Sequence, residues 1–216
     1  MLFCSIYETG GIKEMKTAEQ IINKRAFIKE EMDKNLPKEQ SDALWEEATR
    51  RLKKNLDKYS TLPKGVRLHT ERSIFPASAI YLTLKEAVGN HTAYSIIENA
   101  AISYTVPIGE KLAKLMKIPG MRSVFMSIWD PMTKKLFGPS NGFQNVFYPK
   151  KKNEFRMDVT ACPYCRYFTE LGCPELTKIY CENDDRTYGN LPGLKFERTG
   201  TLGKGAERCD FCIRKV

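Results

Sequence analysis

The chain has 216 residues, of which 42% are hydrophobic and 28% charged, so it can bury a full core as one domain or as two small ones. The formal net charge of +9 favours anionic partners in general. The basic residues do not concentrate, however, and the longest run is Lys150-Lys151-Lys152. With no nucleic-acid motif beside that run, we expect no nucleic-acid partner.

The sequence gives no sign of a membrane or secreted protein. Residues 1–12 lack the basic start and the long apolar stretch of a signal peptide. No apolar run approaches the roughly 18 residues of a membrane span. We therefore interpret the protein as cytoplasmic, where thiols are mostly reduced and clustered cysteines are ligands or reactive groups more often than structural disulfides.

Helical patterns dominate residues 1–142. Thr17 and Gln20 form a capping-box pair ahead of apolar residues at helical spacing, and Pro37 separates this helix from a second amphipathic one. Glycine or proline then bounds each of the remaining predicted helices, which cover 76–88, 92–104 (with Tyr104 facing inward), 107–118 and a last apolar turn or two containing Phe125, Ile128 and Trp129.

After residue 142 the apolar period changes. Residues 154–162 alternate like a half-buried strand with Cys162 on its polar side, and 163–171 and 174–188 look helical. Two more strands, 194–202 and 206–214, are predicted to form a hairpin through Gly203-Lys204-Gly205. We predict an α+β fold in which a helical region (1–142) packs on a small antiparallel sheet in a cysteine-rich region (143–216), as one continuous domain.

The cysteines are the most informative residues. Six of the seven lie between Cys162 and Cys212, and only Cys4 lies outside. Cys162-Pro163 and Cys173-Pro174 each open a predicted helix, and proline is favoured at the first helical position. The N-terminal end of a helix favours a thiolate over a thiol, so we expect reactive or metal-binding sulfur here.

A structural zinc or iron–sulfur site is one alternative. Cys162-x-x-Cys165 and Cys209-x-x-Cys212 have the spacing of two halves of such a site. Cysteines three apart on a strand point to opposite faces, however, so we predict that Cys209 and Cys212 do not bind the same ion. The cofactor is left open, with zinc as a candidate.

A thiol–disulfide enzyme is a second alternative. Cys162-Pro163-Tyr164-Cys165 is spelled like a glutaredoxin active site. The surroundings differ from that fold, because Thr105-Val106-Pro107 precedes the motif instead of following it. The two histidines, His69 and His91, are expected to be structural.

The predicted helix 174–188 offers a third arrangement. Cys181 and Asp184 are three residues apart and therefore neighbours on the helix surface. A thiol beside a carboxylate suits a nucleophile with an acid/base partner, or part of a metal site. An ordinary amphipathic helix with a packed cysteine and solvated acids explains the same pattern.

The C-terminal residues also resemble a known family. The pattern is a strand ending in Cys162, a helix with Cys181-x-x-Asp184, and residues 196–202 followed by Gly205 and Cys209-Asp210-Phe211. It resembles the L-2-amino-thiazoline-4-carboxylic acid hydrolase family, best over about 154–213. The layout is also similar to 4-vinyl reductase-type small-molecule-binding domains.

The resemblance implies hydrolytic opening of a thiazoline ring to N-carbamoyl-L-cysteine. It implies that Cys181 or Cys162 attacks the ring carbon or ligates a metal that activates water, with Asp184 as base. The remaining members of the implied site are Cys209, with Arg198, Arg208 and Asp210 as substrate-binding residues. The resemblance also implies a carboxylate-bearing substrate.

The sequence also predicts how the cysteines are grouped in space. We expect Cys162, Cys181 and Cys209 to lie around one pocket between the helices and the sheet. Cys165, Cys173 and Cys212 fall outside the family pattern. A non-enzymatic ligand- or metal-binding module of the same fold is the alternative function, and homo-oligomerisation is left open.

Overall fold

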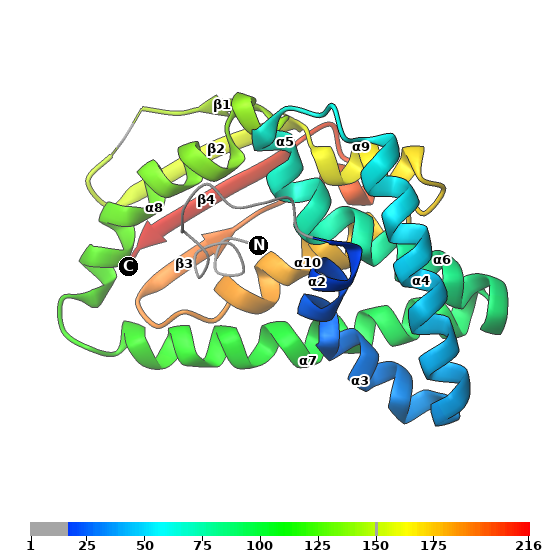
Figure 1. Ribbon diagram of the computed structural model, residues 1–216. Coiled ribbons are helices and arrows are strands. Elements are labelled where there is room, and N and C mark those ends of the chain that lie inside the picture. The colour runs from blue at the N-terminus through cyan, green and yellow to red at the C-terminus, as the bar shows by residue number, and fades with distance from the viewer. Residues whose placement is uncertain (1–16, 150) are drawn as a thin grey trace.

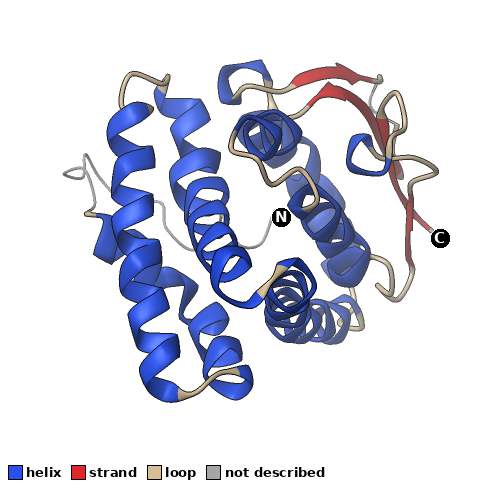
Figure 2. Ribbon diagram, turned by 90° about the vertical axis from the view of Figure 1, so that its right-hand side faces the viewer, coloured by secondary structure: helices blue, strands red, loops and turns tan. Residues whose placement is uncertain are grey.

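The structure is a computed structural model that describes residues 17–149 and 151–216, so Cys4 lies outside the described residues. Helices form one side of the molecule and a four-stranded sheet the other (Figures 1 and 2). All strand pairs are antiparallel, in the order β1-β2-β4-β3. The predicted α+β fold is confirmed. In the described part of the chain, no helix combines the length and apolar character needed to cross a bilayer.

The first helices follow the sequence prediction closely. Gln20 N donates to Thr17 Oγ1 (3.2 Å) and Thr17 N donates to Gln20 Oε1 (3.1 Å), so the capping box is confirmed. Pro37 immediately precedes the second amphipathic helix. The elements up to residue 74 are α2 (Ala18–Ile22), a 3-10 turn (Asn23–Arg25), α3 (Ala26–Asn35), α4 (Lys38–Lys58), α5 (Lys64–His69) and a π turn (Thr70–Ile74).

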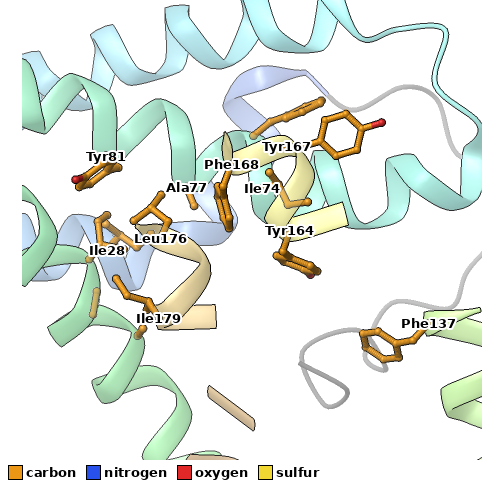
Figure 3. Packing of buried hydrophobic residues seen from close by; sticks show 14 of the residues in the cluster. Ile28, Ile74, Ala77, Tyr81, Phe137, Tyr164, Tyr167, Phe168, Leu176 and Ile179 are labelled. Atoms are coloured by element: carbon orange, nitrogen blue, oxygen red, sulfur yellow. The ribbon is translucent and has the colours of Figure 1, made fainter. Parts of the chain in front are cut away.

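Helix α6 (Phe75–Val88) forms the centre of the helical layer, because nine of its residues are buried. It ends at Gly89, whose φ of 83° suits glycine. Around it the hydrophobic core continues into the C-terminal region, where Phe168 and Leu176 pack near Ala77 and Ile74 (Figure 3). The helical and cysteine-rich regions therefore share one core.

Helix α7 (Asn90–Met116) is a correction to the prediction, because one helix replaces the two expected on either side of Pro107. Pro107 lies on the exposed face, where water can bond the Ser103 carbonyl that loses its helical partner. Tyr104, predicted to face inward, is 36% exposed. On the buried face Gly109 allows close packing, since a Cβ there would lie 2.6 Å from the Arg186 carbonyl oxygen.

Helix α8 (Met121–Phe137) is much longer than the predicted turn or two. Phe125 and Trp129 are buried as expected, but Ile128 is 51% exposed. After a 3-10 turn (Pro139–Asn141), the chain forms β1 (Gln144–Phe147), a strand that the sequence pattern did not reveal.

The remaining elements carry the sheet and two helices. They are β2 (Glu154–Ala161), α9 (Pro163–Glu170), α10 (Leu176–Tyr188), β3 (Leu194–Glu197), a 3-10 turn (Leu202–Lys204) and β4 (Cys209–Lys215). The predicted hairpin is confirmed, because β3 pairs with β4. Its first strand is shorter than predicted, and residues 198–208 form the connection. Val159 pairs with Cys209 in the β2–β4 register.

His69, which was expected to be structural, lies in the interior and contacts two other helices through its imidazole. Its side chain is buried, its Nε2 lies 2.8 Å from the Leu136 carbonyl oxygen and its Nδ1 lies 3.2 Å from Tyr164 Oη. A neutral ring can donate to the carbonyl and accept from the tyrosine. The imidazole therefore ties α5 to α8 and α9.

The buried histidine should make stability fall in acid. Burial lowers the pKa of His69 from 6.5 to about 4. Between pH 6.5 and 4 the histidine takes up a proton in the unfolded chain but not in the folded protein. The free energy of unfolding is therefore unaffected above pH 6.5 and falls as the pH drops to 4, by about 3 kcal/mol for a pKa difference of about 2.5. Urea unfolding of the wild type and His69→Gln between pH 4 and 7 measures this. We expect a flatter profile in His69→Gln, and parallel wild-type and His69→Gln profiles would contradict the assignment.

Candidate functional site

A cavity lies between the sheet and helices α8, α9 and α10. Its walls are mostly aromatic and aliphatic, with six side chains that carry chemistry: Cys162, Cys165, Cys181, Asp184, Arg198 and Cys209. Cys162, Cys181 and Cys209 therefore converge on one pocket, as expected from the sequence. Their chemical roles stay predictions.

Cys181 and Asp184 come from the same face of α10. Both are buried, at 7% and 5% exposure. The turn after β3 closes over the thiol, because a Cβ at Gly203 would lie 2.8 Å from Cys181 Sγ. Burial and then the charge of Asp184 raise the pKa of Cys181 to about 11. At neutral pH this thiol keeps its proton, so it needs a base to act as a nucleophile.

Arg198 holds Asp184 in place. Its side chain is only 2% exposed and donates to Asp184 Oδ2 (3.2 Å), Asp185 Oδ2 (2.6 Å) and the Cys181 carbonyl oxygen (3.0 Å). The guanidinium also lies 5.1 Å from the ring centroid of Phe211. Burial alone would lower the pKa of Arg198, but the two aspartates outweigh it and raise it. With its charge compensated in this way, Arg198 positions the α10 carboxylate.

The position of Cys162 and the pKa values of Cys162 and Cys165 differ from the sequence prediction. Strand β2 ends at Ala161, so Cys162 does not sit on its polar side; it caps α9 and lines the cavity. A hydrogen bond with Cys165, followed by burial, raises the pKa of Cys162. The same hydrogen bond lowers the pKa of Cys165. The thiolate expected on Cys162 is therefore favoured on Cys165, a residue outside the family pattern.

The thiolate expected at the second Cys-Pro pair, Cys173-Pro174, is also not favoured. It is completely buried and precedes the N-cap of α10, which is Glu175. Burial raises the pKa of Cys173 to about 11, so no thiolate is favoured there. The residue packs in the core instead of lining the cavity.

Cys209 and Cys212 lie on opposite faces of β4, as strand alternation predicts. Cys209 is buried in the cavity wall and accepts a hydrogen bond from Leu202 N (3.2 Å), whereas half-buried Cys212 pairs across the sheet with Arg156. Burial raises the pKa of Cys209 to about 12. Of the two thiols, Cys209 lines the cavity and can meet a ligand there, whereas Cys212 does not line it.

Arg208 and Asp210 lie outside the cavity, so the structure does not place them with the other predicted site residues. Arg208 is largely exposed, and its Nε lies 3.3 Å from Asp158 Oδ2. Asp210 accepts from Thr199 N (2.9 Å) and Gly200 N (2.8 Å), which braces the loop that follows Arg198. Their positions argue against direct contact with a ligand in this cavity.

The six cysteines that the structure describes do not form a metal-binding cluster. Within 17–149 and 151–216, no group of three or more histidine, cysteine, aspartate or glutamate side chains is arranged to hold a metal ion. The zinc candidate therefore lacks a matching set of ligands in the described chain, and we derive no chemical step through a metal.

Two contributors to the cavity were not among the predicted site residues. Cys165 was weighed with Cys162 in the Cys-x-x-Cys motif but was placed outside the family pattern, and the structure places it in the cavity wall. The second is the aromatic wall from α8 and the following loop: Trp129, Phe137 and Phe143. Nothing in the local sequence connects that wall to the cysteines.

Comparison with known proteins identifies the family of the chain. No curated protein and no solved structure matches the chain. The model of the L-2-amino-thiazoline-4-carboxylic acid hydrolase family matches residues 67–213, which is more than half of the chain and includes every side chain of the cavity. The chain therefore belongs to the L-2-amino-thiazoline-4-carboxylic acid hydrolase family.

Proposed function

We propose that the protein hydrolyses the ring of L-2-amino-thiazoline-4-carboxylate to N-carbamoyl-L-cysteine, or opens the ring of a related small heterocycle in the same way. The observation that carries the proposal is the pairing of Cys181 with Asp184 on one wall of a cavity that is otherwise mostly apolar. Family membership supplies the class of reaction. A mostly apolar cavity with a few polar groups is the usual form of a small-molecule site.

In the proposed reaction, Cys181 attacks the amidine carbon between the ring sulfur and nitrogen. Asp184 takes the thiol proton and delivers it to the ring sulfur as the carbon–sulfur bond breaks. Water then attacks the same carbon and expels the Cys181 sulfur, which regains a proton. The sum is one ring opened by one water, with the enzyme unchanged. Arg198 acts through Asp184 as a positioning residue.

A buried hydrogen-bond donor supports the presence of a polar ligand. Trp129 is 3% exposed and lines the cavity, and its indole N–H has no acceptor among the described residues. Burying a donor in this way costs about 1–3 kcal/mol, which a ligand acceptor would recover. We propose that this group binds an oxygen of the substrate carboxylate, and that Cys162 and Cys209 contact the ring.

The test is a ring-opening assay with purified protein. Incubation with L-2-amino-thiazoline-4-carboxylate should give N-carbamoyl-L-cysteine, heavier than the substrate by one water, detected by mass spectrometry. A saturated thiazolidine carboxylate, which lacks the amidine carbon, should not be opened. Binding of the thiazoline without product, measured by calorimetry, would contradict the hydrolase and favour the non-enzymatic binding module. Elemental analysis of the same sample tests for zinc or iron.

A further inference from the structure

The proposed function gives Cys162 only a contact with the ring and assigns no chemistry to the pair Cys162 and Cys165. Cys162 is the N-cap of α9 and Cys165 is the third residue of that eight-residue helix. Both side chains line the cavity, and the two thiols are joined by a hydrogen bond. Two sulfurs held together beside a ligand cavity suggest chemistry of their own.

The backbone geometry suits a disulfide between them. Residues three apart at the start of a helix have Cα atoms about 5 Å apart, from the rise and radius of the α-helix. Disulfides require roughly 4.4–6.8 Å between Cα atoms. Pro163 occupies the first helical position and fixes the turn between the two cysteines. The other Cys-x-x-Cys, at Cys209 and Cys212, lies on a strand, where the side chains point apart.

We propose that Cys162 and Cys165 are a redox-active dithiol that closes to an intramolecular disulfide on the cavity wall by exchange with low-molecular-weight disulfides. Cys165 attacks one sulfur of the small disulfide, forms a mixed disulfide and releases one thiol. Cys162 then attacks the Cys165 sulfur, closes the protein disulfide and releases the second thiol. The protein loses two electrons and two protons, which reduce the small disulfide to two thiols. The inference does not rest on the hydrolase function.

The electrostatics agree with this order of events. The hydrogen bond from Cys162 lowers the pKa of Cys165, so Cys165 is the attacking thiolate. Backbone N–H groups of Tyr164 and Cys165 also bond to the Cys162 sulfur. They stabilise negative charge on that sulfur when it in turn loses its proton.

Tryptic mapping tests the proposal without an activity assay. The full-length protein is equilibrated in mixtures of reduced and oxidised glutathione, quenched in acid, alkylated and digested. Cleavage after Arg156 and Arg166 places Cys162 and Cys165 alone in peptide 157–166, and cleavage after Arg208 and Arg214 places Cys209 and Cys212 alone in peptide 209–214. We expect 157–166 to become two hydrogens lighter and lose both alkyl groups, while 209–214 keeps both.

Two cysteine variants and the pattern of cross-linked peptides test which thiols react. Cys162→Ser should hold glutathione on Cys165 as a mixed disulfide, because the resolving thiol is gone, and Cys212→Ser should behave like the wild type. The proposal is overturned if 157–166 keeps both alkyl groups in the most oxidising mixture. A cross-link between 157–166 and the Cys181 peptide, 179–186, would also overturn it, since the cavity would then oxidise between helices.

Discussion

Cys181→Ser should remove most of the ring-opening turnover and leave the fold intact. The proposed nucleophile is lost, because a serine hydroxyl is harder to deprotonate than a thiol whose pKa is already about 11. The change is nearly isosteric, and burying a hydroxyl in place of the thiol should cost about 1–3 kcal/mol, which a folded domain tolerates. Asp184→Asn should lower turnover by roughly 10²–10⁴-fold, as is typical for a lost general acid or base. The measurements are the ring-opening rate and circular dichroism.

Matched controls come from neighbouring residues. Asp185→Asn removes the other carboxylate that Arg198 binds, but Asp185 is half exposed and does not line the cavity. Cys212→Ser removes a thiol from the opposite face of the sheet. Both should retain most of the turnover. Wild-type rates in Cys181→Ser, with a substrate that the parent opens, would exclude Cys181 and shift the assignment to Cys162 and Cys165.

The fold followed from local patterns wherever the pattern and the packing agreed. The alternation of Phe155, Met157 and Val159 predicted β2 because one face of that strand is buried against helices. Strand β1 escaped because it has four residues and only its pairing with β2 defines it. Pro107 predicted a break that did not occur, since it lies on the exposed face, where the carbonyl that proline leaves unbonded is open to water.

The site was predictable to the extent that sequence neighbours share a face. Cys181 and Asp184 are three apart on a helix, so their meeting in the cavity follows from helical geometry. Cys162 also reaches the cavity, but strand alternation does not predict this. Strand β2 ends one residue before it, and Cys162 is the N-cap of α9. Trp129 and Phe137 reach the cavity through the packing of α8 on β2, a contact that no local pattern encodes.

Removing the Arg198 charge should strongly destabilise the protein. Arg198→Met keeps an extended apolar stem over Phe211 but takes the cation from Asp184, whose side chain is 7% exposed. Removing one partner of a buried ion pair typically costs about 3–5 kcal/mol, because the remaining charge is no longer compensated. Urea unfolding at neutral pH measures the loss. Asp184→Asn in the Arg198→Met background should recover part of it, which a double-mutant cycle resolves.

Arg208→Met is the matched control for this prediction. Arg208 also pairs with an aspartate, Asp158, at 3.3 Å, but the arginine side chain is 60% exposed. Asp158 is itself buried, at 9% side-chain exposure, but it keeps the hydrogen bond from Tyr148 Oη (2.9 Å), and the exposed arginine contributes about 1 kcal/mol, so this variant should lose much less stability than Arg198→Met. Equal losses in the two arginine variants would show that burial does not set the strength of the Arg198 pair. If Arg198→Met instead kept full stability, Arg198 would not hold Asp184 in place, and the positioning role proposed for it would fail.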